Sequence, residues 1–71
     1  MDKKDIRKHI IDNGIKNLKE FGYPQVDEKN ILNNTVYSAF FLSMLEENVG
    51  TDSRVDEVLK ELIEEINENN P

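Results

Sequence analysis

The chain has 71 residues, no cysteine, one histidine and a net charge of −6, from 9 basic and 15 acidic residues. The lack of cysteine excludes disulfides and the usual structural zinc sites, and the acidic balance argues against nucleic acid as a partner. A chain this short buries only roughly 60% of the surface that its unfolded form exposes, so we expect one thin core that a second subunit would help to stabilise.

The first helix is predicted to begin at about Asp2 or Asp5 and to end at Phe21. Large apolar residues recur there at the i, i+4 spacing of one buried face, at positions 6, 10, 11, 15, 18 and 21. Gly22 can adopt the left-handed conformation that ends a helix, and Pro24 cannot continue one. Gly14 lies within the apolar arc, so we expect it to admit a bulky neighbour, Phe40 or Phe41, with a bend in the helix as the alternative.

The connector over residues 23–33 is predicted to contain a short extra helical turn. Asp27 can cap a turn over residues 28–32. Val26, Ile31 and Leu32 would then fold back over one end of the core.

The second helix is predicted to begin at Asn33 or Asn34, both good N-caps, and to run to about Asn48, with Gly50 as its C-terminal stop. Its apolar residues cover well over half of the helical circumference, by rough estimate. They are Val36, Tyr37, Ala39, Phe40, Phe41, Leu42, Met44, Leu45 and Val49. A helix with so much apolar surface is expected to contact two neighbours, or one neighbour and a partner.

The third helix is predicted to begin at Asp52 or Ser53, with the segment from Ser53 to Asp56 resembling a capping box. Its apolar positions repeat as a narrow stripe at 55, 58, 59, 62, 63 and 66, and acidic residues cover the opposite side. Residues 67–71 are expected to fray. The sequence thus predicts an all-α, three-helix domain over residues 1–66 with a short extra helical turn between the first two helices.

Candidate chemistry is sparse. Neighbouring carboxylates at 46–47 and 64–65 lie on exposed helix faces and cannot face each other across a cleft, and His9 has no nucleophile partner. The three glycines are scattered and form no phosphate-binding motif. We therefore expect no enzymatic activity, with no catalytic residue, cofactor site or metal site.

A helix-turn-helix role is disfavoured because seven acidic residues on the third helix would repel DNA. The basic residues of the first helix are expected to offset that acidic helix instead. An acidic surface that mimics DNA remains an alternative.

Three stretches carry a resemblance to a known group of proteins. The segments 21–24 (FGYP), 30–32 (NIL) and 36–46 (VYSAFFLSMLE) resemble small uncharacterised proteins of bacteriophages and prophages of Gram-positive bacteria. The resemblance spans roughly residues 15–66 and its motifs are mostly apolar. It implies a compact helical protein of the bacterial cytoplasm, and it carries over no catalytic or binding residue.

The expected function is therefore that of a protein-interaction or regulatory module that self-associates through the second helix as a homodimer. The candidate interface residues are Tyr37, Phe41, Leu42, Leu45 and Val49. Two alternatives stay open: a nucleic-acid-directed regulator, and a small-ligand binder around the aromatic cluster of the second helix. We expect a cytoplasmic protein without a membrane partner, because no apolar run approaches the ~20 residues of a membrane span and the first residues lack the apolar stretch of a signal peptide.

Overall fold

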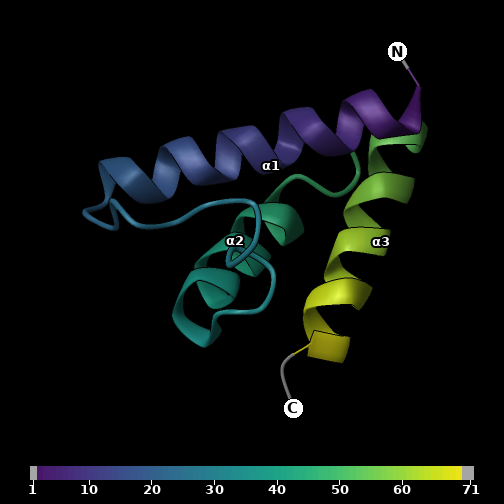
Figure 1. Ribbon diagram of the computed structural model, residues 1–71. Coiled ribbons are helices and arrows are strands. Elements are labelled where there is room, and N and C mark those ends of the chain that lie inside the picture. The colour runs from purple at the N-terminus through teal and green to yellow at the C-terminus, as the bar shows by residue number, and fades with distance from the viewer. Residues whose placement is uncertain (1, 70–71) are drawn as a thin grey trace.

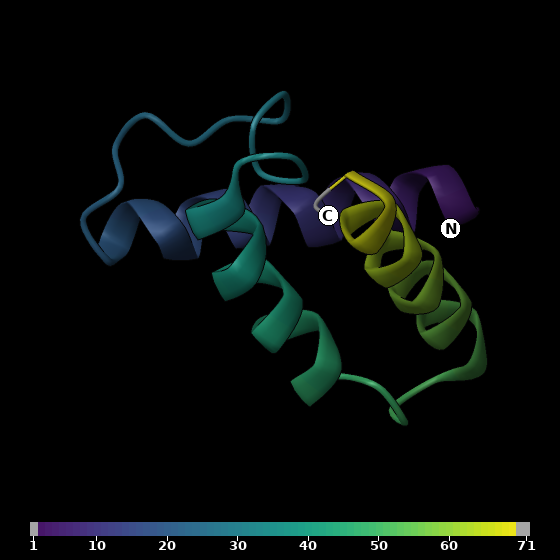
Figure 2. The same cartoon turned by 90° about the horizontal axis from the view of Figure 1, so that it is seen from below.

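The structure, a computed structural model, describes residues 2–69, and three helices make up most of that range. α1 spans Lys3–Glu20, α2 spans Thr35–Glu47 and α3 spans Ser53–Asn69. α1 lies across α2 and α3, which sit on the same side of it (Figure 1). In the view from below, α2 and α3 lie in front of α1, and the connector between α1 and α2 lies beyond the N-terminal end of α2 (Figure 2). Each pair of helices is in contact, which confirms the predicted all-α, three-helix domain.

Each helix begins at a polar side chain that accepts hydrogen bonds from the first turn. The carboxylate of Asp2 accepts from the N–H of residue 5 (3.0 Å), and the amide oxygen of Asn34 accepts from residues 36 and 37 (3.0 and 3.1 Å). Asp52 caps α3 by accepting from residue 54 (2.9 Å). The predicted capping box is wrong, because the Asp56 carboxylate accepts from the N–H of Gly50 (2.8 Å), in the loop before the helix.

α2 ends close to Asn48, as predicted, whereas the role of Gly50 and the end of α3 differ from the predictions. The C-cap of α2 is Asn48, so Gly50, with a φ of +101°, lies two residues beyond the cap in the following loop. α3 continues through Asn69, because residues 67–69 include no glycine or proline and their exposed polar side chains need no burial. Of the tail predicted to fray, residues 67–69 are therefore helical, and residues 70–71 lie outside the described residues.

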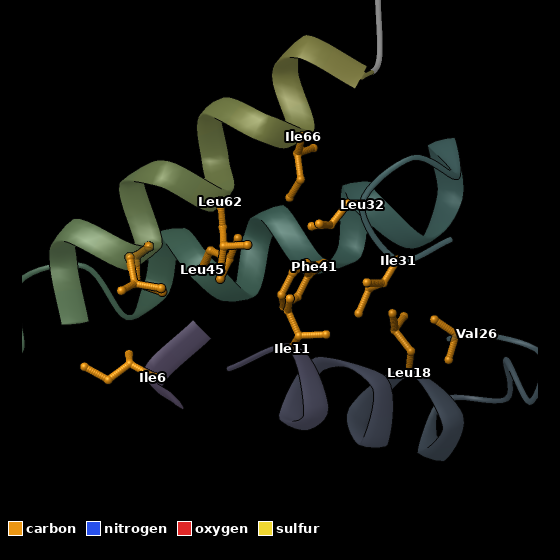
Figure 3. Close-up of a cluster of buried hydrophobic side chains, with 12 residues drawn as sticks. Ile6, Ile11, Leu18, Val26, Ile31, Leu32, Phe41, Leu45, Leu62 and Ile66 are labelled. Atoms are coloured by element: carbon orange, nitrogen blue, oxygen red, sulfur yellow. The ribbon is translucent and has the colours of Figure 1, made fainter. Parts of the chain in front are cut away.

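The connector completes the core, as predicted. The Asp27 carboxylate accepts from the N–H groups of Lys29 and Asn30 (2.9 and 3.0 Å), and the Ile31 N–H donates to the Asp27 carbonyl (3.0 Å). These bonds form single turns without a continuous helix. They place Val26, Ile31 and Leu32 inward, between the helices (Figure 3). The buried cluster consists of Ile6, Ile11, Leu18, Val26, Ile31, Leu32, Phe41, Leu45, Val58, Leu59, Leu62 and Ile66.

Gly14 faces the core and admits an aromatic ring, which confirms the first of the two expectations. A Cβ atom at this position would lie 2.5 and 2.7 Å from two ring atoms of Phe41 and 3.1 Å from a methyl carbon of Ile31. The ring of Phe41 therefore packs directly on the backbone of α1. This close approach sets the distance between α1 and α2 and buries Phe41 completely.

Candidate interaction surface

The end of α1 brings two aromatic residues to the surface. Gly22 has a φ of +106° and donates to the carbonyl of Lys19, and the Tyr23 N–H donates to the carbonyl of Leu18 (3.1 and 3.0 Å). This pair of bonds is the Schellman motif, in which the left-handed residue turns the chain sharply away from the helix axis. Phe21 is left at the C-cap of α1, and Tyr23 is turned toward α2.

Four of the five aromatic residues gather where α1 ends and α2 begins, and we call Phe21, Tyr23, Tyr37 and Phe40 the aromatic patch. Phe21 stacks on Phe40 at a centroid distance of 6.4 Å, and Tyr23 contacts the rings of both Tyr37 and Phe40 at 5.6 Å. Phe21 is 73% exposed and Phe40 is 44% exposed, whereas the two tyrosines are half-buried. Aromatic pairs contribute about 0.5–1.5 kcal/mol each. These contacts hold the four rings together and leave Phe21 and Phe40 exposed to water.

The patch continues into the solvent side of α2, which we call the uncharged face: Val36, Ala39, Phe40 and Ser43, all exposed. No charged residue occurs in α2 before residue 46. The solvent side of α3 is instead almost entirely charged or amide-bearing. Since water-facing helix positions are normally polar, a helix that exposes valine and phenylalanine and no charge over three turns is unusual on a soluble protein.

The five predicted interface residues fall into different places. Phe41 and Leu45 lie in the core, because Phe41 fills the space above Gly14 and Leu45 packs beside it, so neither offers surface to a partner. Leu42 is half-buried against the same core. Tyr37 belongs to the aromatic patch, and Val49 is exposed in the loop at the other end of α2.

Phe21, Tyr23 and Val36 are not among the interface residues that the sequence predicts, whereas Phe40 belongs to the aromatic cluster of the second helix that the sequence offers as a ligand pocket or an interface. The predicted place of Phe21 on the buried face of the first helix is wrong, because Phe21 is the C-cap of α1 and is 73% exposed. One signal was available at Phe21: a C-cap position beside an exposed glycine gives an aromatic ring little reason to be buried.

The basic residues of α1 are partly used within the fold. Lys3 forms ion pairs with Glu57 and Glu61 of α3 (3.3 and 3.1 Å), and Arg7 binds Glu65 through two hydrogen bonds (2.7 and 3.1 Å). The hydrogen bond to Glu61, followed by that to Glu57, raises the pKa of Lys3 above its ordinary value. These contacts confirm that basic residues of α1 offset the acidic α3.

A second surface feature is a groove of about 350 Å³ between the three helices. Its lining includes Asn13 and Asn17 of α1, Phe41 and Met44 of α2, the C-cap Asn48, and Val55 of α3. The groove shares no residue with the aromatic patch. No group of three or more potential metal ligands occurs among residues 2–69. Within the same range, no helix combines the length and hydropathy of a membrane span.

Comparison with known proteins adds no relative. The chain matches no family model, no curated protein and no solved structure. The candidate surface therefore rests on its own geometry.

Proposed function

We propose that the protein is a non-enzymatic interaction module that binds another protein chain through the aromatic patch and the uncharged face of α2. The observation that carries this proposal is the 73% exposure of Phe21 stacked on the 44% exposed Phe40. Aromatic residues are enriched where proteins meet, and they dominate the binding energy there. The ring contacts also fix the side chains in advance, which lowers the entropy lost on binding.

The paired basic residues of α1 support a protein partner over a nucleic acid. Lys3 and Arg7 are already neutralised by α3, and the chain as a whole is acidic. A surface that must displace phosphate counterions needs unpaired cations. The bacteriophage origin and the bacterial cytoplasm belong to the same proposal, and they rest on the resemblance of residues 15–66 alone.

The test is photo-cross-linking in bacterial cells that produce the protein. A benzophenone amino acid at position 21 should form one reproducible protein adduct, identified by mass spectrometry. The same probe at position 64, on the charged solvent side of α3, is the matched control and should form none. The substitution Phe40→Ser in the chain that carries the probe at position 21 should abolish the adduct, because it removes the ring on which residue 21 packs.

Two outcomes would contradict the proposal. One is a chain that forms no more adduct at position 21 than at position 64. The other is an adduct at position 21 that persists with Phe40→Ser, since contact by chance does not require the patch to be intact.

A further inference from the structure

We infer that the partner is a second copy of this chain, and that the two α2 helices pack antiparallel through their uncharged faces around a two-fold axis. This inference rests on the proposed function and identifies its partner. Three properties of α2 carry it: the placement of its charges, the size of its exposed side chains, and the area that it leaves uncovered.

The charged residues of α2 interact unfavourably with the dipole of their own helix. The first turn contains no acidic residue and the last turn contains no basic one, while Glu46 and Glu47 lie in the last turn. Carboxylates are stabilised near helix N-termini and destabilised near C-termini. In an antiparallel pair, Glu46 and Glu47 of each chain lie beside the N-terminal turn of the other α2. In a parallel pair, the four carboxylates would meet at one end and repel one another.

The shape of the exposed face suits the same arrangement. Ala39 and Ser43 lie one turn apart in its middle, and both are small and exposed. An antiparallel pair centred between these two positions sets Ala39 against Ser43 of the second copy, so the helix backbones can approach closely. Val36 then meets the aliphatic stems of Glu46 and Glu47 of the second copy, and Phe21 and Phe40 cover the edge of the contact.

The uncovered area agrees with a dimer of modest affinity. From the exposed fractions of Phe21, Phe40 and Val36, these three side chains offer on the order of 300 Å² of apolar surface. Ala39 and Ser43 add only small side chains, so the face stays below the roughly 800 Å² per partner of a standard interface. We therefore expect a dissociation constant on the order of 10–100 µM.

Sedimentation equilibrium from about 5 to 500 µM measures this association directly. The native chain should follow a monomer–dimer equilibrium. The substitution Ala39→Arg should weaken the association at least about tenfold, because a long side chain then separates the helices. Since Ala39 is exposed, circular dichroism and the thermal midpoint at low concentration should stay close to those of the native chain.

The double variant Glu46→Lys/Glu47→Lys tests the orientation, because it should stabilise the monomer while it weakens an antiparallel dimer. Lysines at the C-terminus of α2 favour its own dipole, so the thermal midpoint of the monomer should rise. The same lysines beside the N-terminus of the other α2 should weaken the dimer at least about fivefold, even though each chain is four charges less negative. The matched control is Glu64→Lys/Glu68→Lys on the exposed side of α3, which makes the same charge change and should leave the dimer as tight or tighter.

Each outcome decides one part of the inference. A native chain that remains monomeric at 500 µM overturns self-association, while cross-linking of position 21 to a different protein would still uphold the proposed function. A dimer that Ala39→Arg leaves intact overturns the use of α2. A dimer tightened by Glu46→Lys/Glu47→Lys overturns the antiparallel orientation. In cells, an adduct that adds the 8.3 kDa of one further copy supports the inference.

Discussion

Replacing Gly14 with alanine should destabilise the protein, against the usual effect of this change in a helix. An alanine favours a helix interior by about 1 kcal/mol relative to glycine. Here the new Cβ would lie 2.5 and 2.7 Å from the Phe41 ring, whereas carbon atoms normally pack at about 3.5–4.0 Å. The ring must therefore move by roughly 1 Å. Phe41 is fully buried and Ile31 lies beside the same position, so the ring can move only if packed neighbours shift with it.

Overpacking of this kind costs about 1–3 kcal/mol, which exceeds the gain in helix propensity. We expect Gly14→Ala to lower the free energy of unfolding by about 1 kcal/mol, or roughly 4–8 °C in the thermal midpoint of a domain of this size. Urea denaturation followed by circular dichroism measures the change. The control is Asn13→Ala, an exposed position in the same helix, which should stabilise by up to about 0.7 kcal/mol.

A double-mutant cycle with Phe41→Leu tests whether the destabilisation by Gly14→Ala comes from contact with the Phe41 ring. Phe41→Leu removes the ring and with it the Cε1 atom that lies nearest to the new Cβ, so the combined variant should be more stable than the sum of the single effects by about 1 kcal/mol. If Gly14→Ala raises the free energy of unfolding by the full propensity difference, or if the cycle shows no coupling, the close packing of Phe41 on α1 is refuted.

Two further predictions concern the ends and faces of the helices. Asn34→Ala should lower the free energy of unfolding by about 1 kcal/mol, because Asn34 caps α2. The control Asn33→Ala, at an exposed position outside the cap, should change it by less than about half of that. Urea denaturation measures both changes. Both side chains of the Arg7–Glu65 ion pair are more than a third exposed. A double-mutant cycle with Arg7→Met and Glu65→Gln should therefore give a coupling energy of only about 0.2–1 kcal/mol, and 0.5 M NaCl should reduce it. A coupling unchanged by salt, or a stronger effect at Asn33 than at Asn34, would contradict these assignments.

The sequence predicted the helices and the buried connector because hydrophobic spacing and capping residues act locally. It could not predict the rotation of α2. Phe40 and Phe41 are neighbours about 100° apart on the helix, and either could have entered the space at Gly14. The choice depends on how α1 crosses α2, which is a property of the whole fold.

Ser38 shows why polarity alone does not settle that rotation. It interrupts the apolar set and would be expected to face water, yet it is buried at 2% exposure. Its hydroxyl donates to the carbonyl of Asn34 (2.6 Å), so the polar group is satisfied within the helix. With Ser38 turned inward, Val36 and Phe40 are left outside, and this rotation creates the candidate surface.

The composition of the aromatic patch gives the protein a built-in optical reporter. The chain has two tyrosines and no tryptophan, and both tyrosines, Tyr23 and Tyr37, lie in the patch with their rings 5.6 Å apart. Tyrosine emission is therefore not transferred to an indole, and all of it originates at one place on the surface. Ultraviolet fluorescence of the unlabelled protein thus reads the environment of this one surface, so that a dilution series can follow what covers it without any attached dye.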